Sequence, residues 1–144
     1  MRLAIALVLA LILSGCAYAP TDTFVQVSRV QMTARDSGTV YYGTIRRSFT
    51  ANVVNVAVEV DRRIYSGNLE LTFPNETFGL YALYGPRDAA PKSTEALRQT
   101  NYTKAVLSST DKRLLTCDFT DSGGKEARGL CVDEVRRVYD VLLN

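Results

Sequence analysis

Histidine is absent from this chain of 144 residues, and cysteine and net charge are scarce. Without an imidazole the protein has no Ser-His-Asp or Cys-His catalytic group, no His-ligated zinc or haem, and no histidine pH switch. The 17 Lys and Arg residues exceed the 15 Asp and Glu residues by only two charges. Because so small a surplus releases few counterions from a phosphate backbone, we expect no nucleic-acid partner. The length predicts one domain.

An apolar run at the amino terminus is too short to cross a membrane. After the positive charge of Arg2, residues Leu3 to Leu13 are all apolar. As a helix this run rises about 16 Å, roughly half the thickness of the hydrocarbon core. Its length and its positive flank are typical of a signal peptide.

The end of this run, Leu13-Ser14-Gly15-Cys16, resembles the bacterial lipobox. The resemblance implies cleavage before Cys16 and attachment of fatty acyl chains, such as palmitate, that hold the protein on a membrane. Because Ala17 rather than Asp follows the cysteine, it also implies sorting to the outer membrane, with the domain facing the periplasm. The alternative is a plain secreted protein cleaved near Ala17 or Ala19, which would lose Cys16.

These features divide the chain into three parts. We expect a lipoprotein signal peptide over residues 1–15, an acylated cysteine and short tether over residues 16–22, and a β-rich globular domain over residues 23–144. The tether carries Pro20 and shows no periodicity. We therefore expect the globular domain to lie close to the membrane.

Strand patterns dominate the globular part. Val54, Val56, Val58 and Val60 alternate with less apolar residues, which indicates a strand with one buried face. A turn at residues 61–63 connects this strand to a second over residues 64–73, which predicts a hairpin. Because Ile64 has the opposite parity to Leu69, Leu71 and Phe73, we expect a β-bulge at Gly67.

The middle of the chain is harder to assign. Proline and glycine interrupt residues 74–92, which we interpret as a long loop with a possible short strand over 78–84. Residues 94–106 fit a short helix, or a strand beginning near Ala105. The predicted fold is mainly β: a single small antiparallel barrel or curled sandwich with one short helix or long loop, preceded by a cleaved signal peptide.

Cys117 and Cys131 lie 14 residues apart, on strands predicted to flank a polar loop that contains glycine. In an exported domain two such thiols most simply form a disulfide. A ring of this size stabilises a fold by about 3 kcal/mol in the loop-entropy model. The chain has no Cys-x-x-Cys redox pair, and two cysteines do not complete a zinc site. We expect no metal and no cofactor.

Two pairs of carboxylates are the first candidates for general acid–base chemistry. Glu59 and Asp61 lie two residues apart, and Asp118 and Asp121 flank a strand end. A glycosidase needs two carboxylates about 5 to 10 Å apart in a cleft. We expect these four residues to be solvated or to form turns, and we predict no catalytic residue and no enzymatic activity. A carboxylate-dependent hydrolase remains an alternative.

Tyrosine and arginine supply the candidate binding residues. Tyrosine has an apolar ring and a polar hydroxyl that suit recognition of carbohydrate or protein, although most tyrosines complete a β core. The possible binding surface consists of Tyr41, Tyr42, Tyr65, Tyr81 and Tyr84. Arginine pairs occur at 46–47, 62–63 and 136–137. They fit ordinary solvated turns, or contact with anionic lipid or cell-wall polymer near the tether.

Several motifs of the mature chain resemble a group of small uncharacterised bacterial lipoproteins. They are the lipobox, Gly38-x-x-Tyr41-x-Gly43, Arg63-Ile64-Tyr65-Ser66-Gly67 and the ending Cys117…Gly129-x-Cys131…Arg137-x-Tyr139-Asp140, with Arg136 where the pattern often has glycine. This resemblance implies an outer-membrane lipoprotein and no particular activity. The chain is also similar, at the level of the fold, to the membrane-bound lysozyme inhibitors, but it lacks their Ser-Gly-x-Arg-Tyr loop.

These observations predict an outer-membrane-anchored lipoprotein with a non-catalytic binding or structural role in the envelope. Its expected partners are the membrane, through the lipid, and an envelope protein or cell-wall component. An inhibitor of a cell-wall-degrading enzyme of the lysozyme type is the main alternative.

Overall fold

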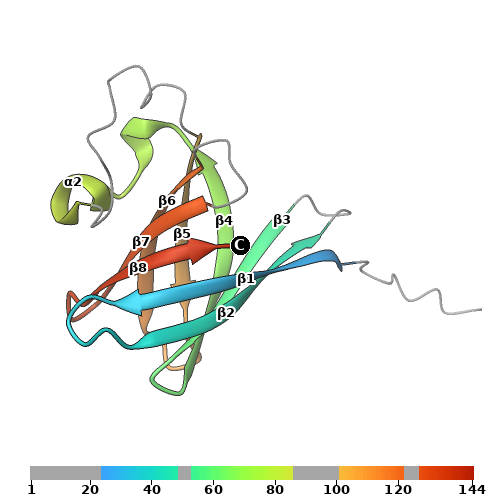
Figure 1. Cartoon of the computed structure of the whole chain (residues 1–144). Coiled ribbons are helices and arrows are strands. Elements are labelled where there is room, and N and C mark those ends of the chain that lie inside the picture. The colour runs from blue at the N-terminus through green and yellow to red at the C-terminus, as the bar shows by residue number, and fades with distance from the viewer. Residues whose placement is uncertain (1–23, 49–52, 86–100, 122–126) are drawn as a thin grey trace, which may run out of the picture.

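A computed structural model describes residues 24–48, 53–85, 101–121 and 127–144. These residues form a closed antiparallel barrel of eight strands in sequence order, and β8 pairs with β1 (Figure 1). The strands are β1 (Phe24–Ala34), β2 (Val40–Ser48), β3 (Val53–Val60), β4 (Arg63–Thr72), β5 (Asn101–Ser108), β6 (Leu114–Asp121), β7 (Ala127–Asp133) and β8 (Val138–Leu143). The prediction of a small antiparallel barrel is confirmed.

Alternating side chains fill the inside of the barrel. In β3, the even-numbered Val56, Val58 and Val60 are buried, as the sequence pattern predicts. In β8, Tyr139, Val141 and Leu143 are buried while the residues between them are partly exposed. Since successive side chains of a strand point to opposite faces, this pattern makes the interior a packed core.

The β3–β4 hairpin is confirmed, but the bulge at Gly67 is wrong. The register runs without a shift from Val54–Leu69 to Val60–Arg63. Ile64 simply faces outward, with 63% of its surface exposed. Glycine at position 67 allows β4 and β5 to approach closely, because a Cβ at this position would collide with the backbone carbonyl of Val106 on β5.

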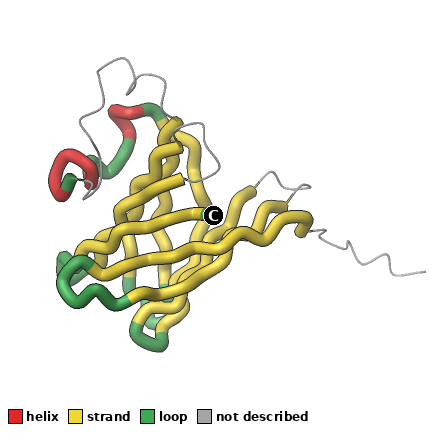
Figure 2. The backbone as a smooth tube through the Cα atoms, viewed as in Figure 1, coloured by secondary structure: helices red, strands yellow, loops and turns green. Residues whose placement is uncertain are grey.

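One short α-helix, α2 (Leu80–Tyr84), follows a single 3₁₀ turn, η1 (Pro74–Glu76), in the described residues (Figure 2). The possible short strand over 78–84 is therefore wrong. The predicted helix over residues 94–106 is wrong from residue 101 onward, because Asn101–Ser108 forms β5, which agrees with the alternative of a strand there. Residues 94–100 lie outside the described residues.

Residues 73–85, which we call the strap, follow the end of β4, and their helix α2 lies against the outer wall of the barrel over β6 and β7 (Figure 1). Leu80 of α2 is buried, and the side chain of Asp118 on β6 lies beneath the strap. The oxygens of Asp118 accept hydrogen bonds from the backbone N–H groups of Phe78 and Leu80, both at 2.9 Å. Arg35 donates to the carbonyls of Tyr84 and Gly85 and pairs with Asp140 on β8. Charged groups thus fasten both ends of α2.

The two ends of the barrel differ. Residues 35–39, 61–62, 109–113 and 134–137 connect consecutive strands at one end, which we call the turn end. The first residue of β1 lies at the other end (Figure 1). Among the residues that the structure describes, no helix is long and apolar enough to cross a membrane.

Candidate functional site

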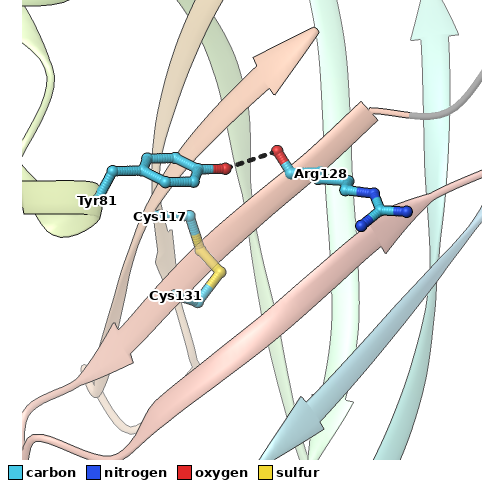
Figure 3. Close-up of a disulfide and its surroundings, with 4 residues drawn as sticks. All are labelled: Tyr81, Cys117, Arg128 and Cys131. Carbon is cyan, nitrogen blue, oxygen red and sulfur yellow. Dashed lines mark hydrogen bonds between the residues drawn. A yellow bond between two sulfur atoms is a disulfide. The ribbon is translucent and has the colours of Figure 1, made fainter. Parts of the chain in front are cut away.

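Cys117 and Cys131 lie directly opposite each other on β6 and β7 and form a disulfide (Figure 3). Their Cα atoms are 4.1 Å apart, and their exposed fractions are 0% and 1%. Both side chains belong to the buried core inside the barrel. The predicted disulfide is confirmed, and its burial shields it from solvent reductants.

Three of the five candidate tyrosines, Tyr65, Tyr41 and Tyr42, lie in three different environments. Tyr65 is buried in the core. Tyr41 packs edge-on against Tyr139, with ring centroids 6.2 Å apart, and its hydroxyl donates a 2.8 Å hydrogen bond to Asp61. Tyr42, its neighbour on β2, is exposed on the outer wall.

The remaining two candidates, Tyr81 and Tyr84, belong to the strap. The Tyr81 hydroxyl donates to the backbone carbonyl of Arg128 at 2.9 Å, and burial raises the pKa of Tyr81 to about 12 (Figure 3). The backbone carbonyl of Tyr84 is held by Arg35. The structure therefore distributes the five tyrosines over the core, the wall of β2 and the strap, and brings no single tyrosine surface together.

The carboxylate pairs do not converge on a cleft. Glu59 is exposed near the end of β3, whereas Asp61 lies in the following turn and contacts Tyr41. The expectation that Asp118 is solvated is wrong, because its exposed fraction is 0% beneath the strap. The side chain of Asp121 lies outside the described residues. Within the described ranges, no cluster of three acidic or cysteine residues fits a metal ion.

Three hairpin turns at the turn end are joined in a ring. Each turn donates one arginine to the next turn and accepts one arginine from the turn before. The three ion pairs are Arg63–Asp111 at 2.8 Å, Arg113–Glu134 at 3.4 Å and Arg137–Asp61 at 3.0 Å. We call these six residues the arginine ring. It links the β3–β4, β5–β6 and β7–β8 turns to one another.

The ring is anchored in the core through Arg137. Its guanidinium also donates to Asp133 at 2.7 Å, and the same carboxylate oxygen accepts the hydroxyl of Tyr139 at 3.1 Å. Asp133 is only 8% exposed. At Asp61, hydrogen bonds from the Tyr41 hydroxyl and from Arg137 lower the pKa of the carboxyl below its usual value. These contacts therefore favour the ionised form of Asp61.

Each turn of the ring also carries a second cation, immediately before the ring arginine. These cations are Arg62, Lys112 and Arg136, with φ angles of 64°, 63° and 65°. A residue with a Cβ adopts this left-handed region at a cost of about 1 kcal/mol or more, so glycine is usual there. The fourth turn follows the usual rule, because its left-handed residue is Gly38, with φ 70°. The three cations make no ion pair with any described residue.

Two depressions adjoin the ring. The first has a volume of about 110 Å³ and is lined by all three ring arginines together with Tyr65, Leu114 and Val135 among others. The second is a groove of about 330 Å³ between the strap and β6–β7. Phe78, Leu80, Leu114 and Val132 give it an apolar lining. Because Leu114, Asp133 and Glu134 line both, the two depressions are adjacent.

Sequence reasoning found two parts of this site and missed the third. The pairs at 62–63 and 136–137 were recognised as arginine pairs, and the structure brings them to the same end of the barrel. The equivalent pair in the β5–β6 turn is Lys112-Arg113, which a search for paired arginines overlooks. A search for two adjacent cations in a hairpin turn would have found all three. Arg46 and Arg47 lie toward the opposite end of β2.

Cys16 lies outside the described residues. Comparison of the chain with protein-family models, curated proteins and solved structures finds no match.

Proposed function

We propose that the protein is an exported, lipid-anchored component of the bacterial envelope, held at the outer membrane through Cys16, with a binding or structural role and no catalytic activity. The observation that carries this proposal is the Cys117–Cys131 disulfide inside the barrel. Structural disulfides of this kind form in oxidising compartments outside the cytosol. The disulfide and the signal-peptide pattern thus support the same cellular location by independent arguments.

The use that the fold makes of its polar groups supports a non-catalytic role. Asp118 is occupied by two backbone amides of the strap, and Asp133 by Arg137 and Tyr139. Both carboxylates therefore stabilise the fold. The packed core leaves recognition to the outer surface, where the turn end carries the arginine ring.

Cell fractionation tests this proposal directly. The full chain and its Cys16→Ser variant are expressed in a bacterium with two membranes, and the membranes are separated by density. We expect the natural chain in the outer-membrane fraction and the variant in the soluble periplasmic fraction. A Cys117→Ala/Cys131→Ala double variant is the matched control, because it loses two cysteines but keeps the acylation site, and it should stay on the membrane.

Two results would contradict the proposal. One is a Cys16→Ser variant that still sediments with the outer membrane. The other is an intact, unacylated leader in the mass spectrum of the purified natural chain. Titration of thiols in the denatured, unreduced protein adds a check on the compartment, because two free thiols per chain would mean that the disulfide does not form in the cell.

A further inference from the structure

We propose that the turn end of the barrel is a binding site for an anionic glycan of the cell wall, with Arg62, Lys112 and Arg136 as the residues that contact its acidic groups. This inference extends the proposed function, and its argument about orientation rests on anchoring through Cys16. The contacts themselves are argued from charge and backbone geometry alone.

The first argument is the charge balance of the three turns. Residues 61–63, 111–113 and 133–137 contain six cations and four carboxylates. The carboxylates are engaged, because Asp61, Asp111 and Glu134 accept ring arginines and Asp133 accepts Arg137. Arg62, Lys112 and Arg136 therefore remain for a ligand. Two further carboxylates lie at this end of the barrel: Asp36, whose oxygen accepts the backbone N–H of Ser37, and Glu59, which is exposed next to the β3–β4 turn.

The second argument is where the unpaired cations sit. All three occupy left-handed positions, where glycine or asparagine would be less strained. Strained residues are retained where the surroundings or a function require them. None of the three makes an ion pair with the rest of the described chain, so all three charges are available to a ligand. A ligand with several acidic groups would use three cations at one end of the barrel.

The ring also links the three turns to one another. Arg63, Arg113 and Arg137 each form an ion pair with the neighbouring turn, so each unpaired cation projects from a turn that contacts the other two. Contacts that restrict the turns before a ligand binds lower the ordering cost of association. The 110 Å³ depression beside the ring is lined by the three ring arginines together with Asp133 and Glu134, and Arg62, Lys112 and Arg136 lie outside its lining.

The apolar groove beside the ring distinguishes a glycan from a simple anion. Acidic sugars carry their charged groups on rings that also have apolar faces. The groove offers apolar carbon beside the arginine ring, and its charged lining residues are Asp133 and Glu134; Phe78 in its lining is 40% exposed. Ligand sites of this kind combine an apolar lining with a few placed polar groups.

The direction of the chain favours the wall over the anchoring membrane. Eight residue steps separate Cys16 from Phe24, so the tether reaches at most about 28 Å. β1 has 11 residues and rises about 33 Å from its first residue to the turn end. Along the tilted barrel axis this rise is about 25 Å. The tether joins the barrel at the end opposite the turn end, and this attachment favours a turn end that faces away from the membrane.

Sedimentation with purified cell-wall sacculi tests the site. The full-length chain is purified in non-ionic detergent, mixed with sacculi and centrifuged. The test variant is Arg62→Gly/Lys112→Gly/Arg136→Gly, which removes three charges at positions where glycine fits the backbone. The matched control is Arg29→Gln/Arg46→Gln/Arg128→Gln, which removes three exposed charges from the strands. Circular dichroism confirms that both variants are folded.

We expect the natural chain to bind sacculi, with an affinity that falls as salt is added. The glycine variant should bind about tenfold more weakly or worse, since three exposed ion contacts are lost, and the control should bind like the natural chain. Phe78→Ala should also weaken binding. Its side chain lines the groove, whereas its contact with Asp118 uses the backbone.

Three outcomes would overturn the proposal. The first is a glycine variant that binds sacculi as tightly as the natural chain. The second is a control that loses as much affinity as the glycine variant. The third is a natural chain that does not bind sacculi and binds mixed micelles of anionic phospholipid instead. Because detergent replaces the membrane in this assay, its result does not depend on acylation. A failure here is thus distinguishable from a failure of the Cys16 fractionation experiment.

Discussion

The carboxylate of Asp118 accepts the backbone N–H of Leu80 at 2.9 Å, although the two residues are 38 positions apart and Asp118 points out of the barrel. Its other oxygen accepts the N–H of Phe78. A buried charge is tolerated only where hydrogen bonds replace its water, and these two amides supply them. This contact decides where the strap lies, and therefore where one wall of the apolar groove lies.

Replacement of Asp118 by alanine should release the strap. We expect the free energy of unfolding to fall by about 3 kcal/mol, since two hydrogen bonds to a buried charged group are lost and two amides are left without partners. Urea denaturation measures this loss, and hydrogen exchange should show faster exchange at the amides of Phe78 and Leu80. Glu59→Ala is the control: because Glu59 is exposed, this substitution should change the free energy of unfolding little. Equal effects of the two substitutions would contradict this role of Asp118.

Two arginines of the ring should differ in their effect on stability. Arg137→Ala leaves Asp133, which is 8% exposed, without its guanidinium, and should lower the free energy of unfolding by about 2 kcal/mol. Arg63→Ala breaks a pair whose side chains are both 46% exposed, and such pairs contribute little. Urea unfolding of the two variants makes the comparison. A larger loss of stability for Arg63→Ala than for Arg137→Ala would contradict this prediction, because the more exposed ion pair would then contribute more than the contact with the nearly buried Asp133.

Glycine should suit the left-handed turn positions and not the strands. We expect Arg136→Gly to leave the free energy of unfolding unchanged or to raise it by up to about 1 kcal/mol, because it relieves the strain at φ 65°. Arg46→Gly, at an exposed position within β2, should lower it by about 0.5 to 1 kcal/mol. Thermal and urea unfolding of both variants test this pair. A clear loss of stability in Arg136→Gly would show that the arginine side chain stabilises the fold.

Tyr81 should ionise late in an alkaline titration. Burial raises its pKa to about 12, whereas the unfolded chain ionises near the ordinary value of 10.0. Because the folded pKa is the higher one, the stabilisation by this residue is complete below pH 10 and is lost as the pH rises toward 12. The absorbance of tyrosinate should still increase at pH values well above 10, and in Tyr81→Phe this increase should be smaller by the contribution of one tyrosine. A Tyr81→Phe titration in which this increase is unchanged would contradict the burial of this hydroxyl.

The strands were predictable because their signal is local. The valines of β3 alternate with less apolar residues, and a strand buries every second side chain, so the inner face could be assigned without knowing any partner strand. The Cys117–Cys131 disulfide followed from spacing and from the loop between the two cysteines. Ile64 shows the limit of this reasoning. Its parity was read as a bulge because an apolar residue was assumed to face inward.

The arginine ring could not be predicted because it depends on closure of the barrel. Arg137 and Asp61 are 76 residues apart, and only the pairing of all the strands brings their turns to the same end. The burial of Asp118 also depends on tertiary structure, since a side chain on the outer face of a strand is expected to be exposed to solvent unless another segment covers it. The local sequence predicts neither the ion pairs between turns nor this burial.

The sequence by itself determined the chemistry of single segments: an apolar leader ending at Cys16, strands of alternating residues, cations in hairpin turns, and two cysteines at a distance suited to a bridge. The tertiary structure alone decided which of these segments meet. Side-chain periodicity and turn preference act within a few residues of the chain, whereas ion pairs between turns and burial beneath the strap depend on distances in space that exist only once β8 has paired with β1.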